Sequence, residues 1–266
     1  WPFAMAASPY WGYPDATTQF CEAKYVVTPY VAEFWNSTSS AVYVVFALLG
    51  LIRGARCQDL RVKLCWVCLG IIGVGSMMFH GTMRFSSQMW DEIPMILLVL
   101  SGIACKDYCC WVTSGVGRWI VNGGCWVATL AAVYLYVSSL FYEVFVHTFT
   151  VLVVVDFLLG ISLALSRPKS PLRWLCLLYG VLIGLGRVIW ECERIFCPDG
   201  GGTAISLLHV VWHFCSAMSA YLGILSNAQA RYELVKVGDP VVSTAEAWPF
   251  VPQWLNRIGD DLDKRQ

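Results

Sequence analysis

Three of the four histidines in this 266-residue chain lie at polar points in otherwise apolar sequence. His80 ends one apolar run, and His209 and His213 lie four residues apart in another. Residues at i and i+4 share one face of a helix, so both imidazoles of the second pair can approach one ion. Three neutral imidazoles with an open fourth position are typical of a catalytic zinc. Imidazole suits zinc and no redox partner is required, so the pattern predicts zinc on His80, His209 and His213.

Two further polar residues accompany His80. Ser76 precedes it by one helical turn, and Asp91 opens the next apolar run. A zinc ion at the histidines would activate a water molecule and polarise a carbonyl. Asp91 is then placed to accept the proton of that water and pass it to a leaving group, while Ser76 can donate to the developing oxyanion. We expect both to be catalytic, and we expect His147, which lacks such neighbours, to be structural.

The elements that must position these residues are membrane helices. The chain is 58% hydrophobic and 14% charged, whereas soluble domains are about a quarter charged. A spanning helix needs about 20 apolar residues, and lipid obliges it to satisfy its own backbone hydrogen bonds. The sequence therefore predicts an all-α polytopic membrane protein. Its seven transmembrane helices are expected near residues 34–52, 62–82, 89–106, 118–138, 144–166, 172–190 and 204–226.

Basic residues favour one set of loops. Those that follow the first, third and fifth predicted spans carry most of the loop Lys and Arg, among them Arg53, Arg56, Arg61, Lys63, Lys106, Arg118, Arg167, Lys169 and Arg173. Cytosolic loops carry this excess. We therefore expect an exoplasmic or lumenal N-terminal segment (1–33), a transmembrane domain (34–228) and a cytosolic tail (229–266). The predicted catalytic residues then lie at one depth, near the exoplasmic side. No basic stretch followed by an apolar core precedes the first span, so we expect no cleavable signal peptide.

The order of these motifs resembles the alkaline ceramidases, which belong to a heptahelical hydrolase superfamily. The resemblance covers roughly residues 10–230 and is carried by Ser76-x-x-x-His80, Asp91-Glu-Ile-Pro-Met, His209-x-x-x-His213, Phe20-Cys-Glu-x-x-Tyr25, Tyr30-Val-Ala-Glu33-Phe-Trp-Asn36 and Ile195-Phe-Cys197. It implies zinc on the three histidines, with Ser76 and Asp91 as catalytic partners. It also implies hydrolysis of the ceramide amide bond in the endoplasmic reticulum or Golgi membrane, on a sphingolipid drawn from the bilayer. The zero net charge gives no reason to expect a nucleic-acid partner.

One part of the motif departs from that family. The family typically binds calcium beside the zinc, through an Asp-Trp-Cys-Glu-Glu-Asn run and the glutamate that opens the first span. Glu22 and Glu33 match, but Gln19 stands at the Asp position and Lys24 at the Asn position. Calcium takes six to eight oxygen ligands, whereas lysine offers only N–H donors. We expect the Lys24 ammonium to replace calcium and to pair with both glutamates. The alternative is that Lys24 turns outward and a weakened calcium site persists.

The chain contains 12 cysteines, most of them in or beside predicted spans, where cysteine behaves as a small hydrophobe. Cys21, Cys192 and Cys197 are predicted to be exoplasmic, and disulfides form in that compartment. The resemblance implies a Cys21–Cys197 disulfide, with Cys192 as the competing partner. Cys109 and Cys110 lie near the expected cytosolic face, where they are candidates for acylation.

Two other functions are compatible with the same residues. One is hydrolysis of a lipid ester by a related heptahelical enzyme, although the Cys-Glu-x-x-Tyr and Glu-Phe-Trp-Asn features favour the ceramidase. The other is a seven-helix lipid receptor in which zinc is structural. The side of the membrane on which the N-terminus lies would distinguish such a receptor from the hydrolases.

Overall fold

The computed structural model describes residues 10–53, 60–106, 115–165, 170–197 and 203–238. Residues 10–33 form turns and irregular chain with one isolated β-bridge between Thr28 and Val31, and the rest of the described chain is mostly helical. The helices are α1 (Phe34–Ser39), α2 (Ala41–Arg53), α3 (Leu60–Thr82), α4 (Phe85–Cys105), α5 (Gly115–Ser139), α6 (Tyr142–Leu165), α7 (Leu172–Phe196), α8 (Thr203–Ser206) and α9 (Leu208–Gly238). The predicted all-α class is therefore confirmed.

Six segments of the described residues are long and apolar enough to cross a membrane. They are Phe34–Ile52, which combines α1 and most of α2, together with α3, α4, α6, α7 and Leu208–Ala230 of α9. The apolar part of α5, Gly123–Ser139, is shorter. The chain is thus an integral membrane protein by the length and composition of its helices. Seven spans and their orientation remain predictions.

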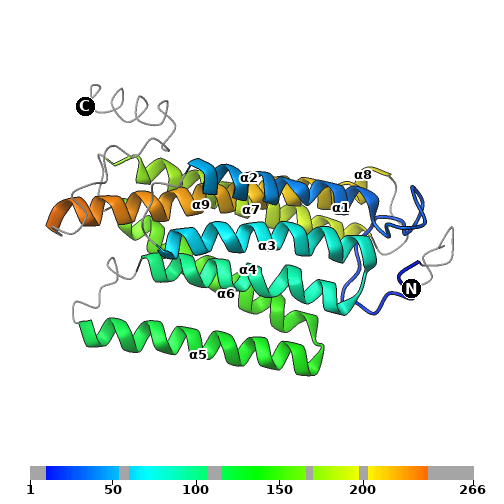
Figure 1. Cartoon of the computed structure of the whole chain (residues 1–266), viewed down its shortest axis with the longest axis horizontal. Helices are drawn as coiled ribbons and strands as arrows, with labels where there is room; N and C mark the ends of the chain where they lie inside the picture. The colour runs from blue at the N-terminus through cyan, green and yellow to red at the C-terminus, as the bar shows by residue number, and fades with distance from the viewer. Residues whose placement is uncertain (1–9, 54–59, 107–114, 166–169, 198–202, 239–266) are drawn as a thin grey trace.

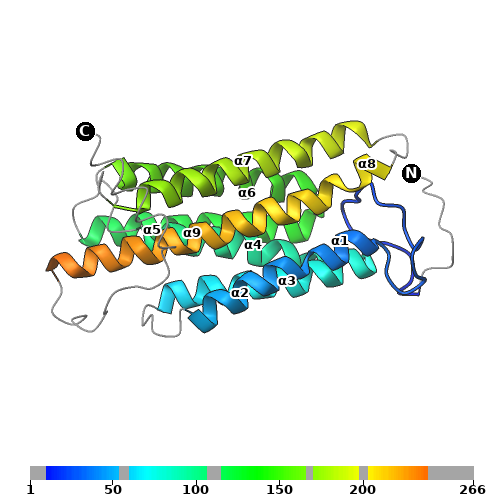
Figure 2. The ribbon, with the colours of Figure 1, turned by 90° about the horizontal axis from the view of Figure 1, so that it is seen from above.

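The long helices run side by side along one axis, and α5 lies at the edge of the bundle (Figure 1). The N-terminal segment, α1, α8 and the end of α7 meet at one end of the bundle (Figure 2). That end also receives the last turn of α3 and the first turns of α4 and α9. Every predicted catalytic residue belongs to one of these meeting elements.

A close contact between α3 and α4 fixes their relative position. A Cβ atom added at Gly75 would clash with the backbone carbonyl oxygen of Trp90, so only glycine permits this approach. Pro94 lies inside α4 and has no N–H to offer the carbonyl of Trp90 four residues earlier. The next residues, Ser76 and Asp91, are consequently brought to the same place between the two helices.

The first span is interrupted at Ser40. Its single hydroxyl proton is shared between the carbonyl oxygen of Asn36 (2.8 Å) and Ser76 Oγ (3.0 Å), which ties the junction of α1 and α2 to α3. The side chain of Glu33, the N-cap residue of α1, makes no capping hydrogen bond to this helix. Instead the Glu22 carboxylate accepts the backbone N–H groups of Trp35 (2.7 Å) and Asn36 (2.8 Å). A carboxylate at this end also suits the helix dipole.

Several boundaries differ from those predicted. Helix α7 continues to Phe196, and α9 begins at Leu208 and continues to Gly238, so the tail predicted from residue 229 begins as helix. Lys106, which we expected in a cytosolic loop, is buried, and its Nζ lies 2.5 Å from Asp156 Oδ1. It therefore adds no surface charge to that loop. The proposed acylation sites Cys109 and Cys110 and the end of the tail lie outside the described residues.

Candidate metal centre

The three predicted histidines converge at one end of the bundle. His80 comes from the end of α3, and His209 and His213 come from the first two turns of α9. Their candidate ligand atoms all lie within 4.8 Å of one another, and each residue is at most 3% exposed. His147 is exposed on α6 and is not a member of this group. The residues predicted from spacing alone thus form a buried group able to hold a metal ion.

Each of these imidazoles has a polar partner at Nδ1. His80 Nδ1 lies 2.6 Å from Glu33 Oε2, and His209 Nδ1 lies 2.9 Å from Glu193 Oε2. His213 Nδ1 lies 2.8 Å from the hydroxyl of Ser39. A ligand histidine in a metal site normally uses one ring nitrogen for such a bond, which fixes its tautomer and orientation. The three Nε2 atoms are thereby left for one metal ion, and the donor set fits zinc.

Ser76 and Asp91 face the same site. Their side chains are hydrogen-bonded to each other, and both line a cavity of about 40 Å³ that His209 and His213 also line. Both residues are buried, Ser76 at 2% and Asp91 at 8% exposed. A carboxylate and a hydroxyl therefore share a small enclosed space with the metal-binding group. This is the arrangement that the sequence predicted for a general base and an oxyanion donor.

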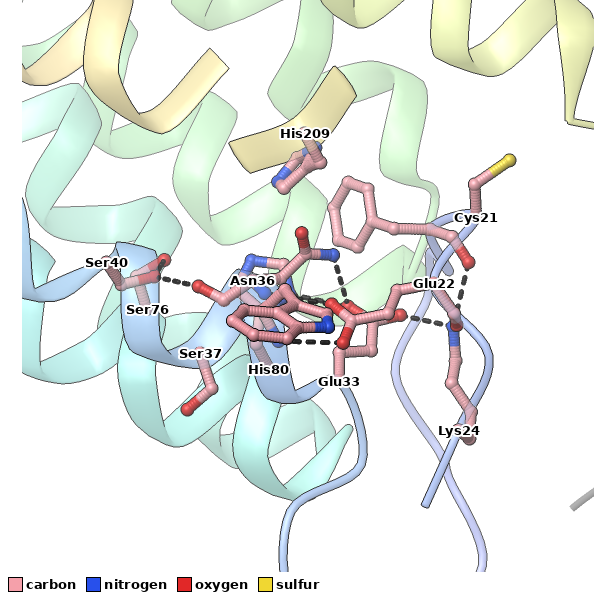
Figure 3. A network of polar contacts seen from close by, with 12 residues as sticks. Cys21, Glu22, Lys24, Glu33, Asn36, Ser37, Ser40, Ser76, His80 and His209 are labelled. Carbon is pink, nitrogen blue, oxygen red and sulfur yellow. Dashed lines mark hydrogen bonds and ion pairs between the residues drawn. The ribbon is translucent and has the colours of Figure 1, made fainter. Parts of the chain in front are cut away.

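The N-terminal segment lies beside the metal centre, where Cys21, Glu22 and Lys24 are near His80 and His209 (Figure 3). The ring of Phe20 lies 3.9 Å from the ring of His209 and 5.0 Å from that of His80, measured between centroids. The backbone N–H of Cys21 donates to Glu193 Oε1 (2.9 Å). Both carboxylates that orient ligand histidines are therefore bonded from this segment, Glu193 by Cys21 and Glu33 by Lys24.

Lys24 points inward and is 2% exposed. Its ammonium donates to Glu33 Oε1 and to the carbonyl oxygens of Phe20 (2.8 Å) and Glu22 (3.0 Å). The predicted pairing with Glu33 is thus present. At Glu22 the Lys24 ammonium donates to the backbone carbonyl, and its charge acts to lower the pKa of the Glu22 carboxyl. Gln19, the remaining residue of the predicted calcium-site remnant, is exposed.

The two glutamates of this network differ electrostatically. Burial raises the pKa of the Glu22 carboxyl above its usual value. Burial acts in the same direction on Glu33, but the Lys24 ammonium and the hydrogen bond from His80 outweigh it and hold the pKa of Glu33 well below its usual value. Glu33 is therefore an anion between Lys24 and His80, where it can accept from both.

A disulfide joins Cys21 to Cys197, with 5.5 Å between the Cα atoms. It ties the N-terminal segment to the end of α7, only four residues beyond Glu193. Cys192, the competing partner, is a free cysteine. The predicted pairing is confirmed.

We expect the Cys21→Ser/Cys197→Ser double variant to be less stable and to bind zinc more weakly. The disulfide spans 176 residues, and loss of such a cross-link costs about 2–4 kcal/mol of unfolding free energy. The Cys21 N–H would also hold Glu193 less firmly, and loss of such support typically weakens metal binding about 10–100-fold. Thermal unfolding and zinc titration against a chromogenic chelator measure the two effects. Cys192→Ser is the matched control; a double variant with the zinc affinity of that control would contradict the expected coupling.

Sequence reasoning named only one of the three residues that orient the histidines. It assigned Glu33 to the pairing with Lys24 and singled out neither Glu193 nor Ser39. A carboxylate at the end of an apolar span is a costly feature that usually has a function, so Glu193 carried a usable signal. Ser39 is one of four consecutive Ser and Thr residues, 37–40, and nothing in the sequence distinguishes it from its neighbours.

Comparison with known proteins agrees with this geometry. The sequence model of the family Ceramidase matches residues 12–253. Alkaline ceramidase 3 of Mus musculus is 27% identical over 255 residues, which cover 91% of this chain and 94% of that protein. Alkaline ceramidase 1 of Homo sapiens is 26% identical over 263 residues, covering 94% and 97%. Alkaline ceramidase of Arabidopsis thaliana is 27% identical over 231 residues, covering 82% and 85%. The range matched by the family model contains all the described helices and the positions of the three histidines.

Proposed function

The chain belongs to the ceramidase family, and we propose that it is a zinc-dependent membrane hydrolase that cleaves the amide bond of ceramide into a sphingoid base and a fatty acid. The observation that carries the proposal is the buried group of His80, His209 and His213 beside the hydrogen-bonded pair Ser76 and Asp91. Seven spans, an exoplasmic N-terminus and a location in the endoplasmic reticulum or Golgi belong to the same proposal.

The three histidines would hold the zinc through Nε2, while Glu33, Glu193 and Ser39 hold the rings in place. Zinc bound there would supply a Lewis acid that polarises the amide carbonyl and makes water nucleophilic at neutral pH. Asp91 accepts one proton from the attacking water as its oxygen adds to the amide carbon. Asp91 then returns that proton to the nitrogen as the carbon–nitrogen bond breaks. The products are a carboxylic acid and a free amine.

Ser76 is placed to assist the same step. Its hydroxyl accepts a hydrogen bond from Ser40 Oγ (3.0 Å), so its own proton remains to be donated. In the resting site that proton goes to Asp91. When Asp91 becomes protonated, the Ser76 hydroxyl can turn to the oxyanion that develops on the carbonyl oxygen. The two residues thus act in sequence on one carbonyl group.

An apolar cavity of about 90 Å³ provides a place for one lipid chain. It shares Tyr43, Met95 and Phe149 with the cavity at the metal centre. It continues between the helices as far as Asn227, about 21 Å along α9 from His213 at 1.5 Å per residue. The partly buried Asp156 and the buried Asn227 lie at its far end, where an alkyl chain would stop.

Filling this cavity is expected to reduce activity selectively on long chains. Gly223 lines the cavity, and a Cβ atom added there meets only Tyr179, at 4.0 Å, so the backbone tolerates a side chain. We expect Gly223→Leu to lower kcat/KM for a long-chain ceramide by about 10-fold, the scale of an extra group in an apolar pocket. A short-chain analogue should lose much less. Gly124→Leu, on α5 with nothing within 4 Å of the added Cβ, is the matched control. Equal losses on long and short chains would contradict the cavity's assignment.

The proposal is tested by incubating the detergent-purified protein with ceramides and with an ester analogue of the same chain length. We expect equimolar release of sphingoid base and fatty acid from ceramide. Cleavage of the ester alone would favour the related ester hydrolase, and zinc binding without turnover on either would favour a receptor. Glycosylation tags at the two termini test the proposed orientation in the same expression system.

A further inference from the structure

The Lys24 ammonium occupies a place built like a cation site. Its neighbours include three oxygens, namely Glu33 Oε1, the Phe20 carbonyl and the Glu22 carbonyl. An ammonium has N–H donors and no acceptor, so oxygen neighbours of this kind suit it. Figure 3 shows Lys24 reaching this cluster from the N-terminal segment beside Glu22 and Glu33, with Glu33 between Lys24 and His80.

A calcium ion, which the family resemblance implies at this place, does not fit the residues that are present. Calcium needs six to eight oxygens at 2.3–2.6 Å. Both carboxylate oxygens of Glu22 already accept the backbone N–H groups that begin α1. Gln19 is exposed, outside the cluster. The remaining oxygens gather around the Lys24 ammonium, whose positive charge would repel a second cation.

The ammonium acts on the metal centre through Glu33. Oε1 of this carboxylate accepts from Lys24, and Oε2 faces His80 Nδ1 at 2.6 Å and accepts from Asn36 Nδ2 at 3.1 Å. Lys24, Glu33 and His80 are each at most 2% exposed, so water does not screen the chain of contacts. Lys24 thus holds the Glu33 carboxylate in place, and Glu33 in turn orients the ring of His80.

We propose that Lys24 is a built-in cation that replaces calcium in this chain and positions Glu33 against His80, so that the zinc centre needs no second metal. A divalent ion can leave when calcium is scarce, whereas a covalently attached ammonium cannot. The centre is then insensitive to the calcium concentration around it. The inference rests on the proposed metal centre and not on the identity of the lipid that is cleaved.

The first test measures metals directly. Purified wild-type protein is equilibrated with millimolar calcium, freed of unbound ions, and analysed for zinc and calcium together with its thermal midpoint. We expect zinc near one equivalent, calcium far below one equivalent, and the same midpoint with and without calcium. One equivalent of bound calcium that raises the midpoint would overturn the proposal, whatever the enzyme hydrolyses.

The second test removes the ammonium. We expect Lys24→Met to weaken zinc binding about 10–100-fold, the range for lost outer-shell support of a ligand histidine. Lys106→Met is the matched control, because Lys106 is also buried against one carboxylate but lies in the opposite end of the bundle. General destabilisation would affect both variants alike. Unchanged zinc affinity in Lys24→Met, or equal weakening in Lys106→Met, would overturn the positioning role.

A third variant keeps the proposal testable if Lys24→Met fails to fold. Lys24→Asn removes the charge and supplies an amide oxygen beside Glu33 and the two carbonyls. We expect its zinc affinity and thermal midpoint to become dependent on millimolar calcium, while those of the wild type stay constant. If calcium changes neither the zinc affinity nor the thermal midpoint of Lys24→Asn, the Lys24 ammonium does not replace a calcium ion.

Discussion

Replacing His80, His209 and His213 together with alanine is expected to abolish zinc binding and ceramide hydrolysis at once. The three imidazoles are the buried metal-binding group of the described residues, with ligand atoms within 4.8 Å of one another. Metal catalysis supplies several kcal/mol of transition-state stabilisation, and each 1.36 kcal/mol is a factor of ten in rate. The rate should therefore fall by about 1,000-fold or more. Zinc content and sphingoid-base release, measured on one preparation, check both losses.

His147→Ala provides the control for this result. His147 is exposed on α6 and lies outside the metal-binding group, so its replacement should leave zinc content and turnover near those of the wild type. Each single histidine variant should lose zinc and turnover about as completely as the triple variant, because all three ligands hold one ion and removal of any of them weakens its binding. A triple variant that still hydrolyses ceramide would remove the basis for a metal mechanism.

Asp91→Asn is expected to keep its zinc while losing activity by about 100–10,000-fold, the range for loss of a general acid–base group. Asp91 lines the cavity at the histidines and is bonded to Ser76, but it is not one of the group's ligands. Asparagine has nearly the same shape and cannot accept a proton from water. In this variant the hydrolysis rate should therefore fall while the zinc content stays the same, whereas both should fall in the histidine variants.

The comparison variant is Asp15→Asn. Asp15 is an exposed carboxylate whose Oδ2 lies 2.9 Å from an Arg84 nitrogen, and exposed ion pairs contribute little. Activity and metal content should both stay close to the wild-type values. Loss of zinc from Asp91→Asn would make Asp91 a metal ligand, and full activity in that variant would exclude it as the proton acceptor.

The ligand group could be predicted from sequence because its determinants are local. A spacing of four residues on a helix places His209 and His213 together, and the ends of apolar runs indicate which residues reach the same depth. Helix boundaries were predicted less well. Helix α7 continues past Glu191 and Glu193 to Phe196 because these carboxylates have protein partners, Arg187 and His209 respectively. The predicted span ended near residue 190, before both glutamates.

The outer shell of the site depends on contacts between distant segments. Glu193 meets His209 and Cys21 only because the disulfide and the fold of the N-terminal segment bring them together. The pairing of Lys24 with Glu33 was predicted from the substitution of a lysine into an acidic motif. The hydrogen bonds from the start of α1 to the Glu22 carboxylate were not predicted, because they depend on where that helix begins.

The most direct test of the central claim is a titration of zinc into metal-free protein in detergent, with sphingoid-base release from ceramide measured at each addition. If one zinc on His80, His209 and His213 performs the hydrolysis, activity should rise in proportion to added zinc and reach a plateau at one equivalent per chain. Full activity in the metal-free protein, or release of sphingoid base that does not follow zinc occupancy, would contradict the claim.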